Sequence, residues 1–187
     1  MSRVSDAEAY AERRYTSLPG LIPADRASTL AALARRLPGR MVTLGEGSTQ
    51  RWEEQQVDDE EHPIRTLLER ELVETVLRIV RPHDRAPGLA HFRCWVTRYG
   101  TGGFLPRHRD RYGTAQLLIC LAVPPAENGG ALGLQAPGCS EEHLQLGPGD
   151  AVVFDATAVD HWTTPLIASE RVPEPERLAA IGRYHLE

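Results

Sequence analysis

The sequence predicts a mainly β domain with flanking helices, built on a double-stranded β-helix (jelly roll). Apolar residues recur at helical spacing through the first half, whereas from Ala90 onward they alternate as in strands. Helices followed by a run of strands are typical of helices packed on an antiparallel core. The 187 residues suit one domain. We therefore expect a single domain over 1–187, helical over about 1–88 and with its jelly-roll core over about 89–187.

Two helices are predicted near the N-terminus. The first runs from Ser5 to Tyr15, with Ser5 as its N-cap and Glu8 three residues on, as in a capping box. The second lies within LPGLIPADRASTLAALARRLPG and ends at Pro38-Gly39. Its apolar face is formed by Leu30, Leu33, Ala34 and Leu37.

The next segments are a short strand, a polar stretch and a third helix. We expect the strand from Met41 to Leu44 and the amphipathic helix from Ile64 to Val80. The polar, acidic stretch 45–62 between them is interpreted as a solvated loop. The alternative is a lid over the mouth of an active site, with Arg51 and Trp52 contacting a substrate.

Five strands are predicted after residue 89, separated by Gly, Pro and Asn turns. They are HFRCWVTRY (91–99), AQLLICLAV (115–123), HLQLGP (143–148), DAVVFDA (150–156) and RLAAIGRYHL (177–186). Strand phase places Arg177, Ala179, Ile181 and Arg183 on one face of the last of them.

Composition excludes several classes of function. The net charge of -5 and the absence of a basic stripe argue against a nucleic-acid partner. All 21 basic residues are Arg, which excludes a catalytic lysine and suggests a GC-rich bacterial genome. Cys94, Cys120 and Cys139 are odd in number and widely spaced, as expected in the reducing cytoplasm. No signal peptide or membrane-spanning run is present, so we expect no membrane partner, whereas the oligomeric state cannot be predicted.

The candidate metal site combines His108 and Asp110, which flank Arg109, with His161 some fifty residues later. Side chains two apart in an extended segment point the same way, so His108 and Asp110 share a face. His161 follows another predicted strand and completes two imidazoles and one carboxylate. Such a set leaves positions on the metal open, as in non-haem Fe(II) oxygenases.

Residues 92–186 resemble the prolyl-hydroxylase-like branch of the Fe(II)/2-oxoglutarate-dependent dioxygenases. The resemblance rests on Tyr99-Gly100, Gly102-Gly103, His108-Arg109-Asp110, Gly129-Gly130, Gly149-Asp150 with Phe154, and His161 followed by Pro165. It implies a cupin-like jelly-roll core and Fe(II) held by His108, Asp110 and His161. It also implies 2-oxoglutarate and O2 as cosubstrates, with ascorbate as a candidate reductant.

The resemblance further implies a basic residue at the start of the last core strand, gripping the distal carboxylate of 2-oxoglutarate. Arg177 opens that strand and is our choice; Arg171, ten residues after His161, is the alternative. Tyr99 is implied to hydrogen-bond the cosubstrate, although it could simply be a packed core aromatic. Cys120 stands where the family often has a tyrosine, and we interpret it as a small buried hydrophobe.

The substrate is less constrained by the sequence. Arg93, Trp95, Arg107 and Trp162 are candidates for lining its pocket, or they could merely pack. The arginines hint at a carboxylate-bearing small molecule in specialised bacterial metabolism: a free amino acid, a natural-product intermediate, or a carrier-bound or peptide substrate. The resemblance implies hydroxylation with release of succinate and CO2, because the related halogenases lack the carboxylate that Asp110 supplies; desaturation, epoxidation and ring formation are left open.

Two other functions suit the same residues. Two histidines and a carboxylate also bind catalytic zinc, so a metal-dependent cupin-type hydrolase or isomerase is an alternative. It would need a glutamate general base, which the sequence does not identify. A metal-binding jelly-roll sensor without turnover is the second alternative.

Overall fold

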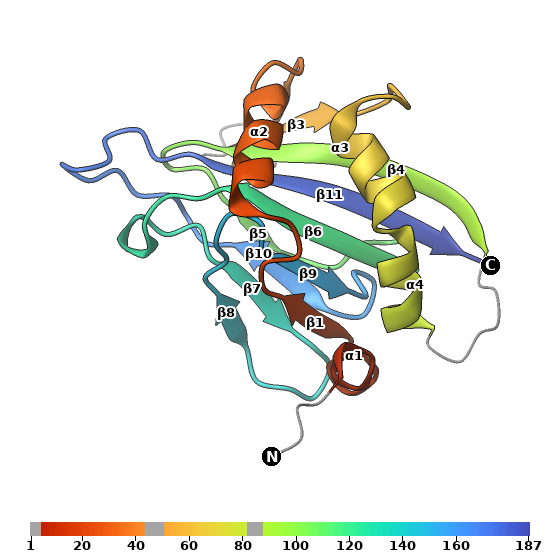
Figure 1. Ribbon diagram of the computed structural model, residues 1–187. Coiled ribbons are helices and arrows are strands. Elements are labelled where there is room, and N and C mark those ends of the chain that lie inside the picture. The colour runs from red at the N-terminus through yellow and green to blue at the C-terminus, as the bar shows by residue number, and fades with distance from the viewer. Residues whose placement is uncertain (1–4, 44–50, 82–87) are drawn as a thin grey trace.

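The structure is a computed structural model that describes residues 5–43, 51–81 and 88–187 (Figure 1). Its helices are α1 (Asp6–Arg13), α2 (Ala24–Ala34), α3 (Pro63–Thr66) and α4 (Val73–Val80), with a π-helical turn η1 (Leu67–Glu71) and a 3-10 turn η2 (Ala126–Asn128). Its strands are β1 (Tyr15–Leu18), β2 (Arg40–Thr43), β3 (Arg51–Gln56), β4 (Leu89–Tyr99), β5 (Leu105–His108), β6 (Ala115–Ala122), β7 (Leu132–Gln135), β8 (Glu142–Leu144), β9 (Ala151–Phe154), β10 (Asp160–Thr163) and β11 (Arg177–Leu186).

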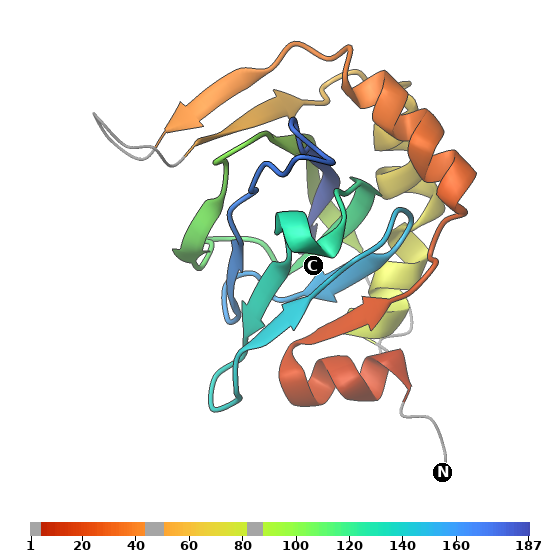
Figure 2. The same cartoon turned by 90° about the vertical axis from the view of Figure 1, so that its left-hand side faces the viewer.

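These strands form two antiparallel sheets. The major sheet has the order β1-β9-β6-β11-β4-β3-β2, and the minor sheet has the order β5-β10-β7-β8. Figure 2 shows the helices on one side of the strands. A mainly β fold with packed helices is therefore confirmed, and β11 lies at the centre of the major sheet between β6 and β4.

Strands β9, β6 and β11 of the major sheet are buried on both faces. Leu117, Ile119 and Leu121 of β6 belong to a cluster with the helical residues Leu30 and Leu68, whereas Leu118 and Cys120 belong to a second cluster with β7. Burial of each such leucine side chain stabilises the fold by about 1.5–3 kcal/mol. Residues 115–121 are consequently all buried, and apart from Gln116 the sequence of β6 is apolar throughout.

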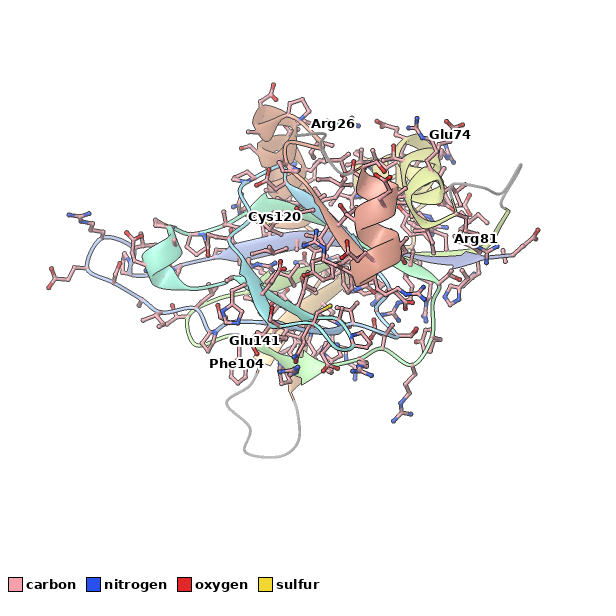
Figure 3. The ribbon with its side chains drawn as sticks, turned by 90° about the horizontal axis from the view of Figure 1, so that it is seen from below. Arg26, Glu74, Arg81, Phe104, Cys120 and Glu141 are labelled. Atoms are coloured by element: carbon pink, nitrogen blue, oxygen red, sulfur yellow. The ribbon has the colours of Figure 1, made fainter. Side chains whose placement is uncertain are left out.

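The layers can be followed in a view from below. Figure 3 labels Arg26 on α2 and Glu74 on α4 toward one side of the molecule, and Phe104 and Glu141 toward the other, with Cys120 between them. Cys120 is fully buried in the cluster between the two sheets. The interior that faces the minor sheet is thus distinct from the core beneath the helices.

The first helix forms where the sequence predicts it. Ser5 and Glu8 make the reciprocal capping-box hydrogen bonds, and α1 ends at Arg13, with Arg14 in the left-handed conformation. Tyr15, predicted as helical, instead begins β1, which pairs with β9 at the edge of the major sheet.

The polar stretch 45–62 is only partly as predicted. Residues 51–56 form β3, which pairs with β4, so the expectation of a solvated loop is wrong there. Residues 44–50 lie outside the described residues. With β1 and β2, β3 shows that the first 88 residues contribute three strands as well as helices to the domain. Local periodicity does not reveal these strands, because they depend on pairing: β1 pairs with β9, β3 with β4, and β2 with β3.

The helix predicted over 64–80 is interrupted at Leu72. The N–H of Leu72 donates to the Leu67 carbonyl at 3.0 Å, a π-helical spacing, and the hydroxyl of Tyr184 donates to the Leu68 carbonyl at 2.7 Å. Leu67 and Leu68 open this wide turn, and their buried side chains still belong to the core beneath the helices. Among the described residues, no helix is both long and apolar enough to cross a membrane.

Candidate metal centre and adjoining cavities

The minor sheet and the loop after β5 bring His108, Asp110 and His161 together. His108 ends β5 directly opposite His161 of β10, and Asp110 lies two residues beyond the strand, where its N–H donates to the Ala156 carbonyl at 2.8 Å. One potential ligand atom from each of the three lies within 4.8 Å of the others. The three residues predicted as metal ligands therefore meet at one point.

Hydrogen bonds fix which imidazole nitrogens face that point. Nδ1 of His108 lies 2.9 Å from the Pro106 carbonyl, and Nδ1 of His161 lies 3.1 Å from the Val159 carbonyl. A carbonyl can only accept, so each Nδ1 carries the proton and each Nε2 keeps its lone pair. The Nε2 atoms lie 3.9 and 4.0 Å from the Asp110 carboxylate oxygens. This is how ligating histidines are held in metal proteins.

Burial keeps His161 neutral. Desolvation, followed by repulsion from His108, lowers the pKa of His161 to about 4. At neutral pH its imidazole is thus deprotonated, which is the form that binds a metal. The Phe154 ring packs edge-on against it at 5.0 Å, which holds the ring orientation from the major sheet.

Two connected cavities adjoin the triad. The inner cavity, about 110 Å³, is lined by all three residues together with Tyr99 and Thr163. The outer cavity, about 340 Å³, shares Asp110, Trp95 and Arg183 with the inner one and adds Arg93 and Tyr112. Of the predicted substrate residues, Trp95 therefore lines both cavities and Arg93 lines the outer one.

Arg177 is the most unusual charged residue near the inner cavity. It is 1% exposed, and none of its three guanidinium nitrogens has a hydrogen-bond partner within the described part of the chain. Its guanidinium carbon lies 5.5 Å from the centre of the Tyr99 ring, and Tyr99 is its partner on β4. Arg171, in contrast, is exposed in the connection before β11.

Tyr99 presents a protonated phenol beside this arginine. Burial raises its pKa, while the charge of Arg177 and hydrogen bonds to Thr163 and Thr97 act in the opposite direction. At neutral pH the hydroxyl is a neutral group that can donate to an anion. Burial likewise raises the pKa of the Cys120 thiol, and this residue is a small buried hydrophobe, as predicted.

Two of the predicted substrate residues lie elsewhere. Arg107 and Trp162 are the strand neighbours of His108 and His161, so they point to the outer face of the minor sheet. There the Arg107 guanidinium pairs with Asp160 at 3.1 Å and lies 4.9 Å from the Trp162 ring centre. Neither lines the cavities at the triad, so the structure places both side chains away from the pocket they were predicted to line.

Sequence reasoning missed Arg183 as a residue of the site. Strand phase places it on the same face as Arg177 but assigns it no role, whereas in the structure its guanidinium contacts the carboxylate of Asp110 directly. The sequence signal for this role is the position of Arg183 in the strand alternation. It shares a buried face with Arg177, and a charge on such a face is costly unless it has a partner. Glu54, which accepts from the Trp52 indole at 3.1 Å, also lines both cavities and was not predicted.

No protein-family model and no curated protein matches the sequence. Solved structures do match it. A prolyl-4-hydroxylase from Pseudomonas putida is 23% identical with a TM-score of 0.75, covering 96% of each chain. An oxidoreductase of the 2OG-Fe(II) oxygenase family from Burkholderia pseudomallei is 20% identical with a TM-score of 0.68, covering 96% of this chain and 88% of that one.

The epimerase SnoN, solved with Fe3+, alpha ketoglutarate and nogalamycin RO, is 15% identical with a TM-score of 0.70, covering 95% of this chain and 81% of that one. These likenesses extend over nearly the whole chain, including the N-terminal helices and strands. The protein therefore has the fold of the 2-oxoglutarate- and Fe(II)-dependent oxygenases.

Proposed function

We propose that the protein is an Fe(II)- and 2-oxoglutarate-dependent dioxygenase that hydroxylates an unactivated C–H bond of a small molecule. One oxygen atom of O2 enters the product and the other enters succinate, with release of CO2. The observation that carries the proposal is the buried, unpartnered Arg177 beside a cavity that holds two histidines and a carboxylate. A site with both features suits a metal and a dicarboxylate together.

The donor set fits Fe(II). Nε2 of His108, Nε2 of His161 and the Asp110 carboxylate would hold the ion, and two imidazoles with one carboxylate leave open positions for other ligands. Iron with bound 2-oxoglutarate supplies the oxidising chemistry, while the protein orients the reactants and excludes water. The partners of the two Nδ1 atoms support this role, since they keep both Nε2 atoms free.

The surroundings of Arg177 fit the distal carboxylate of 2-oxoglutarate. A guanidinium taken out of water without a counter-ion is strongly unfavourable, so a bound anion accounts for it better than packing does. Arg177 would bind that carboxylate through two parallel hydrogen bonds and Tyr99 through one. Arg171 is the weaker candidate, because its exposed side chain can stay solvated.

The outer cavity supports a small substrate that carries a carboxylate. Its volume of about 340 Å³ is at the small end for ligand sites. Arg93 lies directly opposite Arg183 on paired strands, a like-charged pair that disfavours folding. Arg183 is neutralised by Asp110, whereas Arg93 has no ion-pair partner within the described residues. We assign Arg93 to the substrate carboxylate and Trp95 to the cavity wall.

An amino acid or a natural-product intermediate in the cytoplasm of a bacterium is the substrate that best suits these features. The three cysteines are free thiols, in keeping with that compartment. SnoN is an epimerase with the same fold, so the outcome of hydrogen abstraction is part of the test. Ascorbate is proposed only as a reductant that sustains turnover.

The test is anaerobic visible absorption of the protein titrated with Fe(II) and then with 2-oxoglutarate. We expect a weak charge-transfer band between iron and cosubstrate that His161→Ala abolishes. His143→Ala is the matched control, because His143 is half-exposed and pairs with Glu141 on the outer face of the minor sheet. In air, succinate release stimulated by a carboxylate-bearing compound would identify the substrate class.

Other outcomes favour the alternatives. Metal binding without the band supports the cupin-type hydrolase or isomerase. A band without succinate release under any substrate supports a sensor. Failure of the wild-type protein to bind Fe(II), Co(II) or Zn(II) would contradict all three.

A further inference from the structure

Although it lines a cavity, the Arg183 side chain is held by several partners at once. Its side chain is 10% exposed, and its guanidinium contacts Oδ2 of Asp110. Nε and one terminal nitrogen donate to Oε1 of Gln116 at 3.2 and 3.1 Å. The guanidinium carbon also lies 4.9 Å from the Trp95 ring centre and 5.0 Å from that of Tyr112. A charged side chain with this many partners is fixed in one conformation.

Most of these partners come from one short segment. Asp110, Tyr112 and Gln116 lie within seven residues, and Gly113 lies between them with a φ of +110°. A Cβ on Gly113 would lie 3.0 Å from Cγ of Arg183. The segment after β5 therefore wraps around the arginine, and glycine is needed where the backbone passes its stem.

The three candidate ligands differ in how the fold supports them. His108 and His161 are strand residues held by register and by their Nδ1 hydrogen bonds. Asp110 lies outside any strand, and its backbone N–H bond to Ala156 leaves the side-chain torsions free. Within the described chain, Arg183 is the one hydrogen-bond donor to the Asp110 carboxylate. The direction of this carboxylate thus depends on β11 of the opposite sheet.

We propose that Arg183 is a positioning residue that holds one carboxylate oxygen of Asp110 and presents the other to the metal. The inference rests on the proposed metal site and adds the reason why Asp110 acts as a one-oxygen ligand. Partners of this kind tune metal affinity by about 10–100-fold in other sites. The arginine fork suits the task because it contacts Asp110 and Gln116 at once.

The test measures the affinity of the metal-free protein for Co(II) alone, by calorimetry and by visible absorption. We expect Arg183→Met to weaken Co(II) binding by about 10–100-fold. Its Co(II) spectrum should also change, because the freed oxygen can approach the metal. Arg183→Lys keeps a charge without the fork and should recover part of the affinity. If Arg183 acted only in folding, folded Arg183→Met would bind Co(II) with the wild-type affinity and spectrum, and Arg183→Lys would have no affinity to recover.

Arg107→Met is the matched control. Arg107 also pairs with an aspartate and contacts a tryptophan ring, but on the outer face of the minor sheet. It should leave Co(II) affinity unchanged. Circular dichroism establishes whether each variant is folded. If Arg183→Met is not folded, the Co(II) affinity of Arg183→Gln is measured in its place, since this variant removes the charge but keeps an amide donor.

Co(II) binding to folded Arg183→Met with wild-type affinity, or more tightly, would overturn the proposal. Tighter binding would mean that the arginine competes with the metal for the carboxylate. Either result leaves the proposed function standing, since the wild-type protein still binds the ion. Only a wild-type protein that binds no metal would remove both.

Discussion

The two ends of β11 place arginines in opposite situations. Arg177 and Arg183 lie six residues apart on the same buried face of one strand. Arg183 is surrounded by a carboxylate, an amide and two aromatic rings, whereas the nitrogens of Arg177 have no partner among the described residues. The difference teaches that one arginine completes its interactions within the described chain, whereas the other, in the proposed function, binds an external anion.

The largest expected effect concerns the unpartnered arginine. Arg177→Gln should lower the affinity of the metal-loaded protein for 2-oxoglutarate by about 100-fold or more, since charge-assisted hydrogen bonds of about 1.5–3 kcal/mol each are lost. Calorimetric titration under anaerobic conditions measures this. Arg171→Gln is the control and should bind normally. If the two variants behave in the opposite way, Arg171 is the residue that binds 2-oxoglutarate.

Stability should change in opposite directions at the two positions. In the metal-free protein Arg177→Met removes an uncompensated buried charge and should raise the free energy of unfolding by about 1–4 kcal/mol. Arg183→Met removes the partner of a largely buried carboxylate and should lower it by about 1–3 kcal/mol. Urea denaturation of both variants gives the two signs. If both variants changed the free energy of unfolding in the same direction, the two arginines would not differ in their need for a partner.

A smaller effect is expected from the segment around Arg183. Gly113→Ala should lower the free energy of unfolding by about 1–3 kcal/mol, because it combines a positive φ with a contact on the arginine stem. Gly138→Ala is matched to it, since Gly138 also has a positive φ but no neighbour within 4 Å. Only Gly113→Ala should also weaken Co(II) binding. Equal Co(II) affinities would show that the stem contact has no influence on Asp110.

The smallest effect is expected on the outer face of the minor sheet. Arg107→Met breaks a half-exposed ion pair, and such pairs contribute about 0–1 kcal/mol. Thermal unfolding and the 2-oxoglutarate titration should both remain close to wild type. A large loss of 2-oxoglutarate binding would instead indicate that Arg107 contributes to the binding site.

The sequence predicted the structure best where burial imposes a regular alternation of side chains along a strand. The strand predicted over 177–186 has those bounds in the structure, and its phase places Arg177 and Arg183 correctly. The three candidate metal ligands also meet as expected. The alternation that turns His108 and His161 inward turns Arg107 and Trp162 outward, and this placement can be read from the sequence.

Other features depend on contacts that are distant in sequence. β3 is polar apart from Trp52 and becomes a strand because β4 offers it hydrogen bonds. β5, β7 and β10 have four residues each, too few for a clear period. β8 spans Glu142–Leu144 and overlaps the strand predicted over 143–148 only at residues 143–144. The role of Arg183 depends on a loop seventy residues earlier. Such pairings become visible only in three dimensions.

The register of β5 and β10 has a consequence for the lifetime of the protein. β5 is an edge strand that pairs with β10 at only two positions, across a bulge. One of those pairs is His108 with His161, so a bound ion would tether this edge strand at its end. Amide hydrogen exchange over 105–108 should therefore slow when metal is added. Iron supply would then govern the resistance of the protein to proteolysis as well as its chemistry.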